Sequence, residues 1–195
     1  MTHIIPKQRE ELSELEPMLK MVEASMGFLP TSMLTMAHWP ELTQAFGGLG
    51  ATVLHSGELD AGLKQMIAFA VSNVAGCRYC QAHTANSAQK NSVSSEKIKA
   101  VFEFESSALF SDQEKAALRV AVHAGMVPNA VEAEHMSDLS GYFSEKQVIE
   151  VVAVISLFGF LNRWNDTMAT TLESAPKNFA ANQLASHGWA AGKHE

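Results

Sequence analysis

The apolar residues between Asp60 and Gly76 recur with the period of an α-helix, and this pattern constrains the fold more than any other feature of the sequence. Six of them share one face of a helix with 3.6 residues per turn: Leu63, Met66, Ile67, Ala70, Val71 and Val74. Asp60 is a candidate N-cap, and Gly76 is expected to end the helix. No stretch of the chain alternates with period two for long enough to indicate a strand. The sequence therefore predicts an all-α fold.

Further helices are expected along most of the chain. The expected ranges are 7–26, 94–105, 111–124, 129–139 and 144–161, together with a helix that begins at the cysteines and runs to about residue 90. Gly27 is expected to end the first of these helices. Ser111 with Glu114, and Ser144 with Gln147, have the spacing of capping boxes, which supports two of the starts.

The length and hydrophobic content predict one compact domain rather than several. A chain of 195 residues that is 47% hydrophobic can bury one sizeable core. We divide residues 1–195 into N-terminal helices (about 1–58), a half that carries both cysteines (59–110), a second half without thiols (111–172) and a C-terminal tail (173–195). A faint repeat with an offset of 85 residues places Asn165 on Cys80 and Glu150 on Gln65, which hints at duplication. The tail is expected to frame a subunit contact or to fray.

The charge and the amino end exclude several classes of function. The chain has 14 Lys and Arg against 21 Asp and Glu, and no run of basic residues could neutralise phosphates, so no nucleic-acid partner is expected. The first residues, MTHIIPKQREEL, lack the pattern of a secretory signal. The longest apolar run, residues 148–160, is shorter than the roughly 20 residues of a membrane span, so no membrane association is expected. We expect a cytoplasmic protein.

The chain contains two cysteines, Cys77 and Cys80, with C-x-x-C spacing. In a reducing compartment such a pair is typically redox-active or metal-binding rather than a structural cross-link. A thiol with the ordinary pKa of about 8.5 is mostly protonated at neutral pH, so a nucleophilic thiolate must be stabilised. The start of a helix, Arg78 and His83 can each contribute. His83 lies one helical turn after Cys80, which makes Cys80 the expected attacking sulfur.

These residues are sufficient for a peroxide-reducing cycle. A thiolate that attacks a peroxide becomes a sulfenic acid, and a thiol one turn away condenses with it to a disulfide. Cys77 is the expected resolving thiol. An external dithiol then reduces the pair through a mixed disulfide. The cycle requires no flavin, haem or metal, and the chain has no glycine-rich nucleotide fingerprint.

The segment AVSNVAGCRYCQAHT resembles the core of the AhpD-like branch of the carboxymuconolactone decarboxylase family. That family's signature is E-x11-C-x2-C-x3-H, and the resemblance is strong over residues 59–89. Two positions depart from it. Gln65 stands in place of the glutamate of the proton relay, and glutamine cannot carry a proton away. The histidine, His83, is three residues after Cys80 instead of four. Glu58 and Glu150 are candidate substitutes for the missing acid.

The resemblance implies an AhpD-like fold that assembles into trimers or hexamers, a hydroperoxide as substrate, and a lipoyl or other protein dithiol as reductant. Two alternatives remain within the same fold. One is a disulfide-exchange carrier that leaves peroxide untouched. The other is a non-redox member resembling the lactone decarboxylases, which do not depend on a C-x-x-C pair.

The cysteine pair also allows two interpretations that involve no redox chemistry. It could be an inert buried pair. It could instead bind a metal together with His83, which would supply three ligands, whereas a closed structural zinc site has four. The candidates for a fourth ligand are His123, His135 and Asp60.

Overall fold

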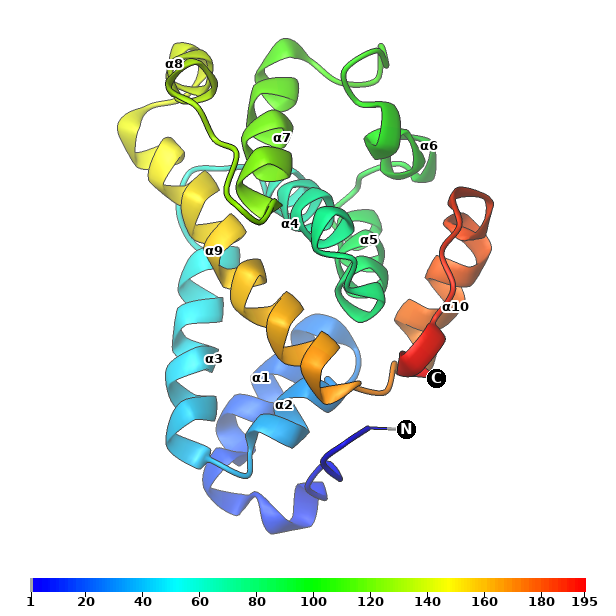
Figure 1. Ribbon diagram of the computed structural model, residues 1–195. Helices are drawn as coiled ribbons and strands as arrows, with labels where there is room; N and C mark the ends of the chain where they lie inside the picture. Colours follow the sequence, from blue (N-terminus) through cyan, green and yellow to red (C-terminus); the bar gives the residue numbers. More distant parts are fainter. Residues whose placement is uncertain (1) are drawn as a thin grey trace.

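The computed structural model describes residues 2–195, which form ten α-helices joined by short loops and 3-10 turns (Figure 1). No strand occurs within these residues, so the predicted all-α fold is confirmed. The α-helices are α1 (Glu16–Met26), α2 (Thr31–Met36), α3 (Pro40–His55), α4 (Ala61–Ala75), α5 (Arg78–Lys90), α6 (Ser95–Lys99), α7 (Asp112–Gly125), α8 (Ala133–Tyr142), α9 (Glu145–Met168) and α10 (Ser174–Gln183). The 3-10 turns are η1 (Arg9–Glu11), η2 (Ser13–Leu15), η3 (Ala100–Glu103), η4 (Ala185–His187) and η5 (Gly192–His194).

Helix α4 is the centre of the molecule, and α5, α7 and α9 pack around it (Figure 1). Its ends are those predicted from the sequence. The Asp60 side chain accepts a hydrogen bond of 2.9 Å from the Leu63 N–H, and Gly76 ends the helix with a φ of 74°, a left-handed conformation that glycine adopts without strain. The next residue, Cys77, then begins α5, so the break between the two helices positions the cysteines.

Helix α9 forms the other side of the main core. It packs against α3, α4, α5 and α7, and its 24 residues extend beyond the predicted range of 144–161 because Asn162 and Asn165 continue the buried face. By length and composition α9 could cross a membrane. In this fold it serves as a core helix, with Val151, Val154 and Leu157 buried.

A buried charge joins the start of α4 to α9. Lys64 is 1% exposed, and its Nζ lies 3.3 Å from a carboxylate oxygen of Glu150. The same Nζ donates to the carbonyls of Val53 and Ser56. Glu150 in turn accepts the N–H groups of Glu58 and Leu59. This network attaches the loop between α3 and α4 to α9.

The N-terminal helices form a second, smaller core. Leu12, Leu15, Leu19, Met33 and Ala37 are buried together there. The first α-helix begins at Glu16, later than predicted, because 3-10 turns occupy residues 9–15. It ends at Gly27, as predicted, with a φ of 80°.

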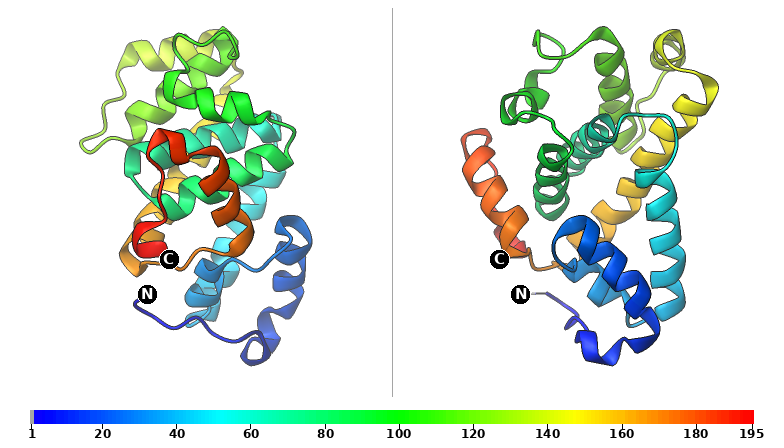
Figure 2. Two further views of the ribbon diagram at one scale, coloured as in Figure 1. Left: turned by 90° about the vertical axis from the view of Figure 1, so that its right-hand side faces the viewer. Right: turned by 180° about the vertical axis from the view of Figure 1, so that it is seen from behind.

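Three predicted segments differ from the structure. The helix predicted over 94–105 is divided into α6 and η3. The helix predicted to begin at 129 begins at Ala133, since residues 126–132 form a loop. The tail is more ordered than expected: α10 packs against α5, and Figure 2 (left) shows the C-terminal residues lying over this part of the molecule. Both capping boxes are confirmed, at Ser111 and Ser144.

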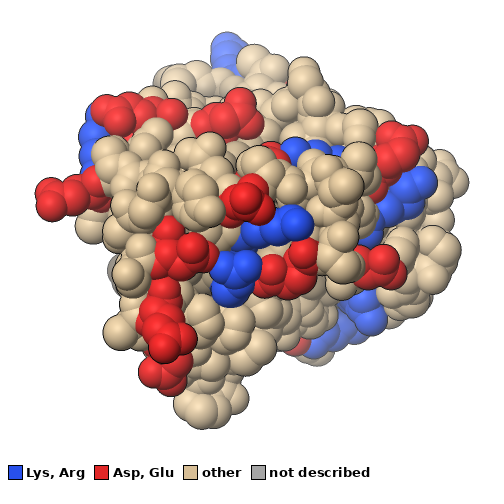
Figure 3. All heavy atoms as spheres, turned by 90° about the horizontal axis from the view of Figure 1, so that it is seen from above, with Lys and Arg blue, Asp and Glu red and all other residues tan. Residues whose placement is uncertain are grey.

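Charged side chains of both signs are interspersed over the face shown in Figure 3. On this face or elsewhere, the charged side chains of the protein form ion pairs that include Arg119 with Glu105 and Asp138, and Lys97 with Glu114. This face therefore shows no continuous basic surface.

Candidate active site

The two cysteines lie at the turn between α4 and α5 as free thiols, and both are buried, at 0% and 2% exposure. Cys77 is the N-cap of α5, and its Sγ accepts a hydrogen bond of 3.4 Å from the Cys80 N–H. A helix start presents unpaired N–H groups and the positive end of the helix dipole. The local fold therefore places the Cys77 sulfur where negative charge is stabilised.

The surroundings shift the two thiol pKa values in opposite directions. Hydrogen bonds from the Cys80 thiol and N–H lower the pKa of Cys77, although burial and the Asp166 charge oppose this. Burial and the neighbouring Cys77 raise the pKa of Cys80 well above its ordinary value. The sequence favoured Cys80 as the attacking sulfur. The geometry instead favours a thiolate at Cys77 and a neutral thiol at Cys80.

Helix α9 supplies a polar contact to the second thiol. The Asn165 Nδ2 lies 3.5 Å from the Cys80 sulfur, and Asn165 is 1% exposed. The offset of 85 residues seen in the sequence places these same two residues in register, and in the structure they touch. The repeat otherwise has a different local form, since α9 is continuous where α4 and α5 are separated at Gly76.

His83 faces a carboxylate that the sequence did not identify. Its Nε2 lies 2.6 Å from a carboxylate oxygen of Glu173, the N-cap residue of α10. The other oxygen of Glu173 accepts the Tyr79 hydroxyl at 2.8 Å and the Thr31 N–H. Burial raises the pKa of Glu173, but the His83 charge and these hydrogen bonds outweigh burial and leave it below the ordinary value. The site thus contains an ionised acid bound to an imidazole.

Aromatic rings enclose this acid–imidazole pair. The Tyr79 ring stacks on the His83 ring with centroids 4.2 Å apart, and Phe28 meets it edge-on at 5.5 Å. Within residues 2–195 no hydrogen bond joins His83 to either sulfur. His83 therefore directs its Nε2 to Glu173 rather than to a thiol.

Neither substitute proposed for the missing relay acid reaches His83. Glu150 binds Lys64 and the loop before α4, and Glu58 pairs with Lys146 at the surface. Both predictions are wrong because these two side chains join the start of α4 to α9. The acid that contacts His83, Glu173, lies in the C-terminal tail, where the sequence pattern indicates only a weak helix. Gln65 lies on α4 and is 8% exposed, and the described structure gives its side chain no hydrogen bond to the thiols or to His83.

Residues 40–123 match the carboxymuconolactone decarboxylase family, and this stretch includes both cysteines and His83. Over this stretch the chain is similar to that family. The predicted resemblance is thereby confirmed. A curated relative, the uncharacterised protein YnjA of Escherichia coli strain K12, is 28% identical over 110 residues, which are 56% of this chain. The match spans about 60% of the length of that relative.

Solved structures place the chain in the AhpD-like fold. The alkylhydroperoxidase AhpD core of a peroxidase-related protein from Ralstonia eutropha JMP134 is 20% identical, covers 90% of this chain and 94% of its own, and superposes with a TM-score of 0.80. The debrominase Bmp8, in a cysteine-to-alanine variant bound to 2,3,4-tribromopyrrole, is 37% identical. It covers 93% of this chain and 97% of its own, with a TM-score of 0.87.

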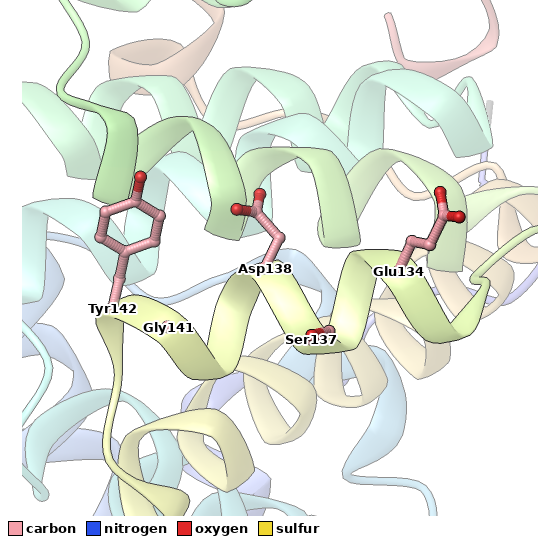
Figure 4. Close-up of a pocket in the computed structure, with 5 residues that line it drawn as sticks. All are labelled: Glu134, Ser137, Asp138, Gly141 and Tyr142. Carbon is pink, nitrogen blue, oxygen red and sulfur yellow. The ribbon is translucent and has the colours of Figure 1, made fainter.

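Two of the hollows on the protein surface bear on the search for a substrate site. One follows α8 and is lined by Glu134, Ser137, Asp138, Gly141 and Tyr142, none of them a predicted site residue (Figure 4). The other, of about 370 Å³, lies between α4, α5 and η3 and is bordered by Arg78 and Gln81. Because these two residues flank Cys80 in sequence, this second hollow is the one adjacent to the dithiol turn.

The C-terminal residues cover the same turn. Trp189 is buried, and its Nε1 donates to the Arg78 carbonyl at 3.2 Å. His194 is 1% exposed and lies near Cys77. Within residues 2–195 the metal set predicted as an alternative is not formed: Asp60 caps α4, and the His123 and His135 rings lie against each other at an angle of 32°, with centroids 4.1 Å apart.

Proposed function

We propose that this protein is a thiol-dependent reductase in which Cys77 and Cys80 cycle between dithiol and disulfide. The observation that carries the proposal is the hydrogen bond from the Cys80 backbone N–H to the Cys77 sulfur, in a turn where both cysteines are free thiols. The opposite pKa shifts give the two sulfurs different tasks. The family match, which includes both cysteines, is consistent with an enzyme.

A hydroperoxide is the first substrate that we propose. The Cys77 thiolate attacks the outer peroxide oxygen and breaks the O–O bond, which yields a sulfenic acid and an alkoxide. A proton converts the alkoxide into an alcohol. The Cys80 thiol then attacks the Cys77 sulfur, and the disulfide and water form. An external dithiol of the lipoyl type returns the pair to the reduced state through a mixed disulfide.

The acid–imidazole pair is the proton donor of this scheme. His83 and Glu173 lie 2.6 Å apart and are both about nine-tenths buried at their side chains, so a proton held between them is shielded from bulk water. We propose that protonated His83 delivers the proton to the leaving oxygen, while Glu173 orients the ring. Glu173 thus takes the place of the relay acid that the family signature has at the position of Gln65.

The test supplies a hydroperoxide and dihydrolipoamide and follows peroxide loss. We expect turnover by the wild type, loss of turnover to the uncatalysed rate in Cys77→Ser, and a decrease of about 100-fold in His83→Ala. A matched control is His187→Ala, which removes an exposed imidazole from the turn after α10. Oxidation of two thiols by a partner disulfide without peroxide loss would indicate a disulfide carrier instead. Unchanged turnover without both cysteines would indicate a non-redox family member.

A halogenated aromatic is a second candidate substrate, because Bmp8 is 37% identical over 93% of this chain. The same dithiol would suffice. The Cys77 thiolate attacks a ring bromine, the C–Br electron pair returns to the ring carbon, and that carbon takes up a proton. Cys80 then displaces bromide from the sulfenyl bromide, and a disulfide forms. Bromide release from a bromopyrrole, measured beside peroxide loss under the same dithiol, decides between the two substrates.

A further inference from the structure

A second group of polar side chains, which does not include His83, lies close to Cys77. The ligand atoms of Cys77, Asp166 and His194 all lie within 4.8 Å of one another. They come from the start of α5, the last part of α9 and the turn η5, so three distant parts of the chain meet at one point. Cys77 and His194 are 0% and 1% exposed, whereas the Asp166 side chain is 45% exposed.

The tautomer of His194 can be assigned from its contact with Thr170. The Nδ1 atom lies 2.8 Å from the Thr170 carbonyl, which can only accept, so Nδ1 carries the hydrogen. In the neutral ring the Nε2 atom is then a bare acceptor. Within residues 2–195 this buried Nε2 has no hydrogen-bond partner. A buried acceptor without a partner, in a group that also holds a thiol and a carboxylate, requires a ligand or a proton donor.

The arrangement does not resemble a nucleophile–imidazole–carboxylate triad. In such a triad the thiol and the carboxylate contact different ring nitrogens. Here the Asp166 oxygen lies 3.6 Å from Nε2 and Nδ1 is held by Thr170, so no second ring nitrogen remains for the thiol. Three ligand atoms that share one centre are typical of a metal site rather than of a proton relay.

We propose that Cys77, Asp166 and His194 bind a thiophilic divalent cation such as Zn²⁺, with a fourth position left for water. Zinc accepts sulfur, imidazole and carboxylate ligands, and an open three-ligand site is one of its usual forms. Nitrogen and oxygen ligands about 2.0–2.1 Å from a tetrahedral ion lie about 3.4 Å apart, close to the 3.6 Å separation here. The exposed side of Asp166 gives the ion a path from solvent, and its other oxygen is held by Lys193 at 2.8 Å.

This site differs from the one expected of a C-x-x-C pair. Cys80 and His83 take no part, since Cys80 contacts Asn165 and the His83 Nε2 is occupied by Glu173. A metal ion and the disulfide would compete for the Cys77 sulfur, so the ion would withhold that sulfur from redox cycling. Binding itself is independent of the proposed function, and only this inhibition rests on it.

The test titrates the reduced, full-length protein with Co²⁺, followed by its thiolate charge-transfer absorption, and with Zn²⁺ in competition with a chromophoric chelator. We expect one ion per chain in the wild type and in Cys80→Ser. We expect affinity to fall about tenfold or more in His194→Ala and in Asp166→Asn. The control His187→Ala keeps the wild-type affinity. Absence of binding by the wild type, or equal binding by His194→Ala, overturns the proposal.

A second experiment uses the wild-type protein alone, so its result does not depend on whether the variants fold. Oxidation of the wild type to the Cys77–Cys80 disulfide should abolish the Co²⁺ absorption, and reduction should restore it. Cobalt bound equally by the oxidised protein overturns the site. If the reduced protein binds the ion but shows no turnover with any electrophile, the proposed function fails and the metal site stands. If turnover occurs and stoichiometric Zn²⁺ leaves it unchanged, competition for Cys77 is excluded and the proposal fails.

Discussion

At the scale of single residues, the two sulfurs can be assigned separate roles. The Cys80 N–H donates to the Cys77 sulfur, whereas the Cys80 side chain is enclosed by protein. In Cys80→Ser we expect peroxide to leave a stable sulfenic acid on Cys77, trapped by dimedone and located by mass spectrometry. The sequence-based assignment predicts the opposite pattern. A dimedone adduct on Cys80 in the Cys77→Ser variant, and none on Cys77 in Cys80→Ser, would restore Cys80 as the attacking sulfur.

The carboxylate of Glu173 should make stability dependent on acid pH. Its folded-state pKa lies below the ordinary value of 4.5, so the stabilisation is fully present above about pH 4.5 and is lost as the pH falls through the folded pKa. We expect Glu173→Gln to flatten this part of the curve of unfolding free energy against pH, measured by urea denaturation. The control is Glu41→Gln, at an exposed carboxylate on α3. A wild-type slope in Glu173→Gln contradicts the assignment.

At the scale of elements, the Lys64–Glu150 pair is the main connection between the start of α4 and α9. Removal of Glu150 leaves an ammonium group that is 1% exposed without its counter-ion, and such losses cost about 3–5 kcal/mol. We therefore expect Glu150→Ala to lower the free energy of unfolding by this amount in urea denaturation.

A matched control for this prediction lies on the same face of α9. Lys146 pairs with Glu58, and both side chains are more than half exposed, so Lys146→Ala should change stability by less than about 1 kcal/mol. Equal effects of the two substitutions would contradict the view that Glu150 acts by neutralising a buried charge.

The elements also show which parts of the site the sequence could predict. Local signals were sufficient for α4 and the beginning of α5, because Asp60, Gly76 and the spacing of Cys77 and Cys80 act within one or two helical turns. The acid partner of His83 could not be found in this way. Glu173 is 90 residues away in the chain and begins a helix with no strong apolar pattern. The offset of 85 residues did contain a true contact, between Asn165 and Cys80.

At the scale of the whole molecule, α9 presents apolar side chains outward. Ile149, Val152 and Phe160 are 68%, 39% and 40% exposed and share one side of the helix. The family resemblance implies a trimer or hexamer, and we expect this side to contribute to the contact between copies. Native mass spectrometry of the wild type and of Ile149→Glu tests this expectation. We expect the variant to dissociate to smaller species, and an unchanged assembly would place the contact elsewhere.

The Cys77 sulfur caps α5, and this has a consequence for the backbone. A thiolate is a strong acceptor for the Cys80 N–H, but a sulfur engaged in a disulfide is a weak one. Oxidation of the dithiol to the disulfide should therefore loosen the first turn of α5. Amide hydrogen exchange at Cys80 should be slower in the reduced protein than in the oxidised one, so that a partner could distinguish the two states by the shape of a helix end alone.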